Sequence, residues 1–80
     1  MIVEDRERYL QALLRTTRLD SGLTQAGLAD RLNRPQSFVS KYENGERELS
    51  IIELEDVCIA LGISLSNFVE KYESGTSDSV

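Results

Sequence analysis

The sequence of 80 residues has no histidine and no tryptophan, and it contains one cysteine and one proline. The lack of histidine excludes a histidine general base, a Ser-His-Asp or Cys-His arrangement, and nearly every common zinc site. A single cysteine excludes an internal disulfide and an all-cysteine zinc site. We therefore expect a protein that is not an enzyme and that carries neither a metal nor another cofactor.

Long apolar runs are also missing from the chain. No stretch approaches the ~20 apolar residues that a membrane helix needs, and no signal peptide opens the sequence. The fractions of hydrophobic residues (40%) and charged residues (29%) are those of a soluble globular protein. We expect a cytoplasmic protein with no membrane attachment, built as a single domain over residues 1–73 with a polar, frayed tail over residues 74–80.

The net charge of −5 is unevenly distributed along the chain. Residues 15–47 contain six basic and four acidic residues, whereas residues 48–80 contain one basic and seven acidic residues. The first 14 residues have a net charge of −1. The acidic balance of the whole chain opposes nucleic acid as a partner, but the basic middle segment keeps that partner possible.

Helical spacing of apolar residues and local start signals predict an all-α fold of five helices with no strand. Three of the starts have a Thr or Ser cap between two apolar residues that form a hydrophobic staple, and Glu53 completes a capping box with Ser50. The three staples are Leu23-Thr24-Leu28, Leu49-Ser50-Leu54 and Ile63-Ser64-Phe68. The expected helices cover residues 4–19, 25–32, 35–44, 51–61 and 65–73.

The helix expected over residues 35–44 has an unusual polar face. Val39 and Tyr42 form its apolar seam, and the other side carries hydrogen-bonding side chains with one cation and no acid. This face consists of Gln36, Ser37, Ser40, Lys41 and Asn44. Glutamine pairs with adenine and lysine with guanine in the major groove, so the face is suited to base recognition. A merely solvated helix face would have a similar composition, and the pattern by itself leaves both interpretations open.

The stretch LTQAGLADRLNRPQSFVSKYENGER, residues 23–47, resembles the helix-turn-helix of the lambda-repressor and Cro class, also called the XRE family. The resemblance covers about residues 9–73 and includes a Leu-Gly ending before the last helix. Two positions depart from the pattern. Gly27 replaces the usual Glu, which costs roughly 1 kcal/mol of helix propensity. Arg34 replaces an aliphatic residue. The matching positions are Gln25, Ala29, Asn33, Val39 and Glu43-Asn44-Gly45.

The resemblance implies a compact five-helix, lambda-repressor-like domain whose third helix enters the major groove of double-stranded DNA. It implies base contacts by Gln36, Ser37 and Lys41, with Ser40 nearby. It further implies phosphate contacts and one structural ion pair, between Arg18 and Glu43. The implied phosphate contacts are Gln25, Asn44 and Arg47, together with Arg34.

The family usually binds DNA as a pair, so we expect a homodimer on a palindromic operator, acting as a transcriptional regulator and specifically as a repressor. The residues expected at the dimer interface are Leu65, Val69 and Tyr72, with Ile2 and Val3, because the staple directs Phe68 inward. The alternative is an acidic protein-interaction module or antitoxin-like partner with the same fold, which the acidic last two helices favour.

Several residues allow two interpretations. Phe38 could pack in the core or contact a thymine methyl group, and Tyr9 and Tyr72 could be core or interface residues. We expect Tyr42 and Cys58 to be core residues, and the acids at 53, 55 and 56 to form a solvated face instead of a metal site.

Overall fold

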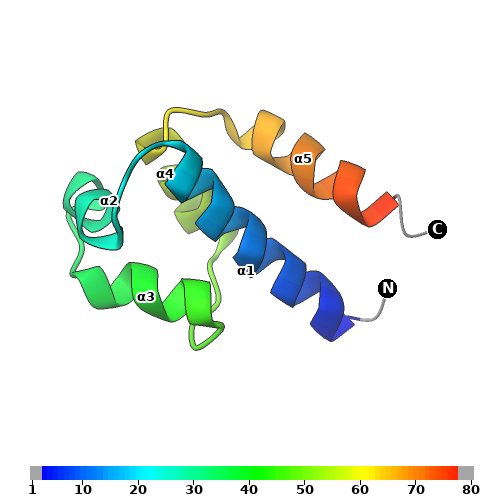
Figure 1. Ribbon diagram of the computed structural model, residues 1–80, viewed down its shortest axis with the longest axis horizontal. Helices are drawn as coiled ribbons and strands as arrows, with labels where there is room; N and C mark the ends of the chain where they lie inside the picture. Colours follow the sequence, from blue (N-terminus) through cyan, green and yellow to red (C-terminus); the bar gives the residue numbers. More distant parts are fainter. Residues whose placement is uncertain (1–2, 78–80) are drawn as a thin grey trace.

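The computed structural model describes the backbone of residues 3–77 and the side chains of residues 6–75. Five α helices account for this part of the chain, and short loops connect them (Figure 1). The expected fold class, all-α with five helices, is confirmed. The helices are α1 (Val3–Asp20), α2 (Gln25–Leu32), α3 (Gln36–Asn44), α4 (Ile51–Ala60) and α5 (Leu65–Ser77).

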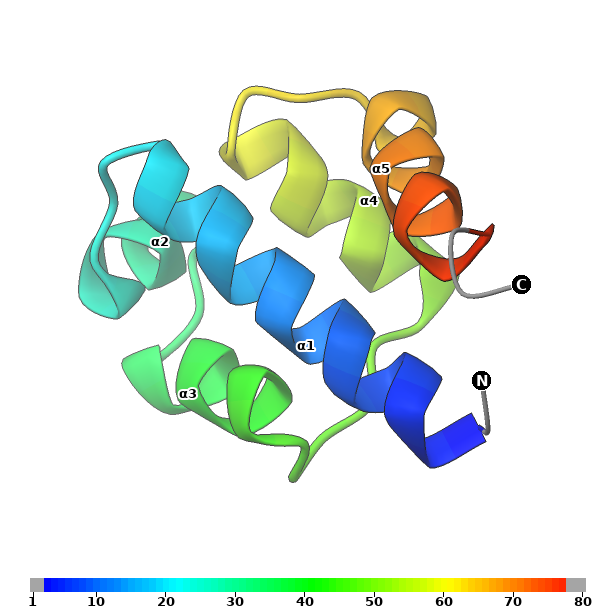
Figure 2. The ribbon, with the colours of Figure 1, turned by 45° about the vertical axis from the view of Figure 1, so that its right-hand side comes forward.

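The helices α2 and α3 lie on one side of α1, and α5 lies on the other side (Figure 2). Helix α1 contacts α3 and α5, α2 contacts α3 and α4, and α4 contacts α5. This arrangement leaves α3 exposed along one side. None of the helices in residues 3–77 is long and apolar enough to cross a membrane.

The predicted caps begin three of the helices. The Thr24 hydroxyl accepts a hydrogen bond from the Gly27 amide (2.9 Å) at the start of α2. The Ser50 hydroxyl accepts one from the Glu53 amide (3.1 Å), and the Glu53 carboxylate accepts one from the Ser50 amide (3.0 Å), which completes the predicted capping box of α4. The Ser64 hydroxyl accepts one from the Asn67 amide (3.1 Å) in α5. Helix α3 begins one residue later than predicted, because Pro35 is its N-cap.

Three helix ends differ from the sequence-based expectation. Helix α1, expected over residues 4–19, begins one residue early and ends one residue late, at Asp20. Helix α4 ends at Ala60, one residue early. Helix α5 continues through Ser77, although a frayed tail was expected from residue 74. A tertiary contact explains the extension. The Tyr9 hydroxyl donates to the Lys71 carbonyl oxygen (3.3 Å), and a Cβ on Gly75 would overlap the Tyr9 ring. Tyr9 thus packs closely against the last turns of α5, a contact that local sequence does not encode.

The core contains side chains from all five helices. Phe38 is 7% exposed, so the structure assigns it to the core, and its ring meets the Tyr42 ring edge-on at 5.5 Å. Tyr42 and Cys58 are buried as expected, and burial raises the pKa of the Cys58 thiol to about 11. The buried apolar residues are Leu14, Leu28, Ala29, Phe38, Val39, Tyr42, Val57, Cys58, Leu61 and Phe68.

Candidate nucleic-acid interface

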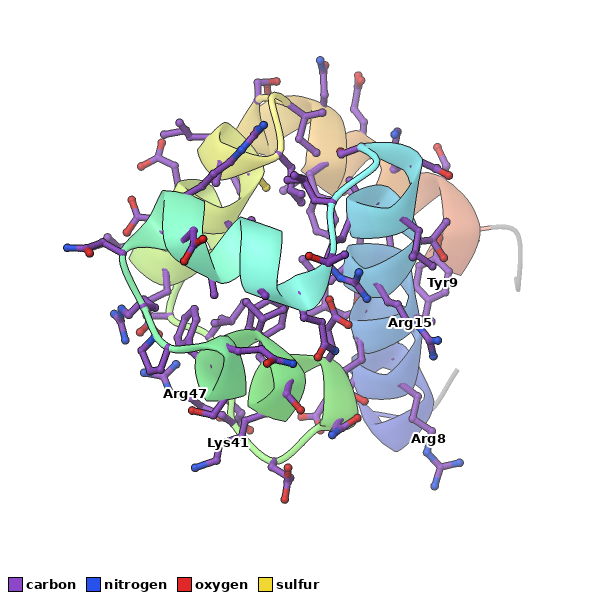
Figure 3. All side chains as sticks on the ribbon, turned by 60° about the vertical axis from the view of Figure 1, so that its left-hand side comes forward. Arg8, Tyr9, Arg15, Lys41 and Arg47 are labelled. Atoms are coloured by element: carbon purple, nitrogen blue, oxygen red, sulfur yellow. The ribbon has the colours of Figure 1, made fainter. Side chains whose placement is uncertain are left out.

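A tight turn of three residues joins α2 to α3. Asn33 adopts the left-handed conformation (φ 56°) that ends α2, and the Arg34 amide donates to the Ala29 carbonyl oxygen (3.0 Å). Ala29 and Val39 are both buried in the core where α2 and α3 pack. A small residue on α2 lets the two helices approach, and the turn sets their angle. The result is a helix-turn-helix with α3 at the surface (Figure 3).

The polar side chains of α3 gather on its outward side. Gln36, Ser37, Lys41 and Asn44 are exposed and Ser40 is half-buried, whereas Phe38, Val39 and Tyr42 on the other side are buried. The Asn44 side chain donates to the Ser40 hydroxyl (3.5 Å). All five residues that the sequence singled out on this helix therefore lie together at one surface.

The only acid on α3 is neutralised by an arginine from α1. The Arg18 Nε donates to Glu43 Oε2 (2.8 Å) and Nη2 donates to Oε1 (3.1 Å), which is a bidentate ion pair. The side chains of Arg18 and Glu43 are 7% and 3% exposed. The hydrogen bond to Glu43 raises the pKa of Arg18, and this effect exceeds the opposing effect of burial. The Arg18 Nη1 also donates to the Leu23 carbonyl oxygen (2.9 Å), so the pair links α1, the loop before α2 and α3.

Two glutamines connect this ion pair to the exposed start of α3. The side-chain Nε2 of Gln25 donates to Glu43 Oε1 (3.1 Å), and the side-chain Nε2 of Gln36 donates to the side-chain oxygen of Gln25 (3.4 Å). One N–H of Gln36 is thereby used, while its oxygen and its second N–H stay available to a ligand. The resemblance implied a phosphate contact for Gln25. It did not indicate that the Gln25 side chain accepts a hydrogen bond from Gln36 and so orients it.

Glu53 holds both arginines that the resemblance assigned to phosphate contact. The Arg47 guanidinium donates two hydrogen bonds to the Glu53 carboxylate (3.0 and 2.8 Å), and Arg34 Nη2 approaches the same carboxylate at 3.4 Å. The two guanidiniums lie 4.8 Å and 4.4 Å from the centre of the Phe38 ring. The hydrogen bonds from Arg47 lower the pKa of Glu53 to about 2. The sequence predicted Glu53 as a helix cap and as part of a solvated acidic face, whereas its side chain is 19% exposed and binds both arginines.

The residues expected at a dimer interface differ in their surroundings. Leu65 packs against the core, and the Tyr72 ring lies 5.7 Å from the Tyr9 ring of the same chain. Val69 is half-buried. Ile2 and the side chain of Val3 lie outside the described residues.

The large exposed apolar side chains lie mainly on α4 instead. Ile51, Ile52 and Ile59 are 63%, 68% and 66% exposed, while Val57 and Cys58 of the same helix are fully buried. This exposed apolar face of α4 was not predicted from the sequence. The segment IIELEDVCIA could have indicated this face, because it has apolar residues on both sides of the helix. A helix that packs one face on the core needs apolar residues on that side alone.

Comparisons with known proteins agree with this architecture. The helix-turn-helix family model matches residues 14–68. The solved structure of an XRE-family like protein from Pseudomonas syringae pv. tomato str. DC3000 is 45% identical and superposes with a TM-score of 0.84, covering 91% of this chain and 89% of that one. The clp gene regulator ClgR from C. glutamicum is 35% identical with a TM-score of 0.74, covering 86% and 87%.

Two further proteins, one described as a controller protein and one as a control protein, are also similar to this chain. The structure of the restriction-modification controller protein C.Esp1396I is 26% identical with a TM-score of 0.82, covering 91% of this chain and 95% of that one. Control protein C.MunI from Mycoplasma sp is 29% identical over 66 residues, covering 82% of this chain and 89% of that protein. The chain belongs to the XRE-type helix-turn-helix family of DNA-binding transcriptional regulators.

Proposed function

We propose that this protein binds a specific sequence of double-stranded DNA through α3 and represses transcription there, without enzymatic activity. The observation that carries the proposal is the outward face of α3, where hydrogen-bonding side chains gather and the one acid of the helix is neutralised by Arg18. A face of this kind can approach the negatively charged DNA without an uncompensated carboxylate. The site of action is the cytoplasm, where the DNA of a bacterial-type cell lies.

Base recognition is assigned to Gln36, Ser37 and Lys41, with Ser40 beside them. The hydrogen bond from Gln36 to Gln25 holds the Gln36 amide in one orientation, with an acceptor and a donor available. That pair of groups matches the N6 and N7 positions of adenine. Lys41 carries a positive charge at the same surface, and lysine most commonly recognises guanine.

Phosphate contacts are assigned to Gln25, Asn44, Arg34 and Arg47, which flank the base-reading residues. The first amides of α2 have no partner within the helix and form a favourable place for an anion beside Gln25. Arg34 and Arg47 are fixed against Phe38 by Glu53, and their side chains remain 45% and 36% exposed. The exposed edges of these guanidiniums are available to a phosphate oxygen.

Homodimerisation on a palindromic operator completes the proposal. A two-fold dimer uses the same surface of both copies and places the two α3 helices about one turn of DNA apart, roughly 34 Å. We assign the interface to the α4 face of Ile51, Ile52 and Ile59, because these side chains are more exposed than Leu65, Val69 and Tyr72 of the surface expected from the sequence.

Selection from a pool of random duplexes tests the proposal. We expect the protein to enrich one palindromic sequence, which is then measured by fluorescence anisotropy. The substitution Gln36→Ala is expected to relax the preference at one position of each half-site and to cost roughly 1–3 kcal/mol there. Arg47→Ala is expected to weaken binding to all sequences about equally, because its contact is to the backbone. Equal affinity for every duplex, or no binding, would contradict the proposal.

A second candidate function is supported by α4. Its exposed face combines the three isoleucines with the exposed acids Glu55 and Asp56, a composition suited to a protein partner. In that case the chain is an interaction module, and neither the wild type nor the Gln36→Ala variant binds any selected duplex. A complex with another protein that is lost on Ile52→Asp would then be expected.

A further inference from the structure

The outer face of α1 carries two exposed arginines. Arg8 and Arg15 are exposed, and neither forms an ion pair or a hydrogen bond with any of the described side chains. Figure 3 shows both on α1, beside the C-terminal end of α3. Every other arginine from Arg18 to Arg47 hydrogen-bonds to a carboxylate or a backbone carbonyl. Among the side chains of residues 6–75, the two α1 arginines therefore have no counter-ion, and they lie next to α3.

The surface between the two arginines lacks acid. Helical periodicity places Ala12, Thr16 and Leu19 on the same face as Arg8 and Arg15, and none of these residues is charged. Glu7, the acid next to Arg8 in sequence, lines a different hollow, on the side of α1 that faces Gly45 and Leu49. The long arginine side chains thus meet no described carboxylate that would reduce their attraction for an anion.

This face is continuous with the recognition helix. Arg8, Arg15 and Ala12 line a surface hollow whose α3 side is formed by Glu43, and Glu43 is already neutralised by Arg18. Arg8 and Arg15 are seven residues apart, which corresponds to about 10 Å along the helix axis. That distance is about the rise of three base pairs, so the two guanidiniums can reach separate phosphates of one strand.

We propose that the Arg8–Arg15 face of α1 contacts the phosphate backbone beside the groove that α3 occupies, and so extends the DNA interface. The inference rests on the proposed function, since it names a further contact of the same complex. The contact contributes affinity and salt dependence but no sequence preference, because phosphates carry no base information.

The test uses two matched double variants of the full chain. Arg8→Gln/Arg15→Gln removes the two cations of the face. Arg6→Gln/Lys71→Gln removes the same charge from elsewhere, because Arg6 lies about 160° around α1 from Arg8 and Lys71 lies on α5. Both pairs are exposed, so thermal melting followed by circular dichroism is expected to match the wild type. Affinity for the selected operator is measured by anisotropy between 50 and 200 mM salt.

We expect Arg8→Gln/Arg15→Gln to lower the slope of log affinity against log salt by about 0.9 per lost contact, or about 3.6 for the four arginines of a dimer. The Arg6→Gln/Lys71→Gln variant keeps the wild-type slope, and so does the charge-preserving variant Arg8→Lys/Arg15→Lys. Phosphate-ethylation interference is expected to disappear at the positions that these arginines contact. The single variant Arg15→Gln is expected to give half of this change in slope. It replaces the double variant in the test if the double variant does not fold.

Two outcomes would overturn the inference while the proposed function stands. One is a slope for Arg8→Gln/Arg15→Gln equal to that of the Arg6→Gln/Lys71→Gln control. The other is a change in sequence preference instead of salt dependence, which would make the arginines base readers. Failure of the wild type to select any duplex would instead refute the proposed function itself, and the inference with it.

Discussion

The Glu43 carboxylate connects three parts of the molecule through its two oxygen atoms. It accepts hydrogen bonds from Arg18 of α1 and from Gln25 at the start of α2, and Gln25 in turn accepts one from Gln36. A change at Glu43 therefore acts on stability, through a buried charge pair, and on DNA binding, through the orientation of Gln36. These two effects can be separated by the choice of substitution.

Removing Glu43 is expected to destabilise the domain. The substitution Glu43→Ala leaves Arg18 buried without a counter-charge, which typically costs about 3–5 kcal/mol. The exposed neighbour Glu46 provides the control, and Glu46→Ala is expected to change the stability by about 0.5 kcal/mol or less. Urea unfolding measures both. Equal unfolding midpoints for the two variants would contradict the structural role of the pair.

Replacing both partners separates stability from DNA binding. The double variant Arg18→Met/Glu43→Leu fills the same space with apolar groups and is expected to recover most of the stability lost in Glu43→Ala. Gln25 still loses its acceptor in this variant. Operator affinity is therefore expected to remain reduced although the fold is restored.

The sequence predicted the participants of the site better than their connections. Family matches and helical spacing identified Arg18, Glu43 and the outward residues of α3, because each depends on one helix or on one motif. Two hydrogen bonds were not predicted, one from Gln36 to Gln25 and one from Arg47 to Glu53. Each depends on the distance between two separate elements, which local sequence spacing does not encode. Glu53 was predicted as a cap, which is a purely local pattern, and as part of a solvated acidic face, but not as the partner of Arg34 and Arg47.

At the scale of the helices, local signals fixed the starts more accurately than the ends. The caps at Thr24, Ser50 and Ser64 are satisfied by side chains close in sequence, so the sequence suffices to predict them. The end of α5 is set by Tyr9, which is 62 residues away from the Lys71 carbonyl that it contacts. Such long-range contacts explain why residues 74–77 are helical although their composition suggested fraying.

Helix α4 provides a prediction about pH. Arg47 lowers the pKa of Glu53 to about 2, whereas an unfolded glutamate titrates near 4.3. Because the folded-state pKa is the lower one, the contribution of Glu53 to stability is present above about pH 5 and is lost as the pH falls toward 2. The difference in thermal stability between wild type and Glu53→Gln should therefore shrink over this range. Glu46→Gln, at an exposed acid in the loop before α4, serves as the control and is expected to change the thermal stability little over this range.

At the scale of the whole molecule, the exposed arginines of α1 and the exposed apolar surface of α4 lie on different helices. The exposed arginines Arg8 and Arg15 lie beside α3 (Figure 3), while the exposed isoleucines and acids of α4 lie on a different helix that contacts α2 and α5. A dimer that pairs the α4 faces would bury the isoleucines, and it would also bring the exposed acids of the same face, Glu55 and Asp56, to the contact. The two α3 helices would then be free to enter successive major grooves.

Assembly is tested by comparing two aspartate substitutions. Sedimentation of the wild type at tens of micromolar is expected to give the mass of a dimer. Ile52→Asp places a charge within the proposed interface, where desolvation disfavours it, and is expected to give a monomer. The chain itself should remain folded, because Ile52 is 68% exposed and an acid near the start of a helix is favourable. Loss of the dimer is expected to weaken binding to the palindrome far more than binding to a single half-site.

Val69→Asp is the matched comparison, on the α5 surface that the sequence suggested. Val69 is half-buried and lies near Phe68 in the chain, so its free energy of unfolding is measured in parallel. A dimer that withstands Val69→Asp but not Ile52→Asp assigns the interface to α4. The opposite result restores the α5 surface. A wild type that stays monomeric at these concentrations, and that binds half-site and palindrome equally well per site, would refute dimerisation as part of the function.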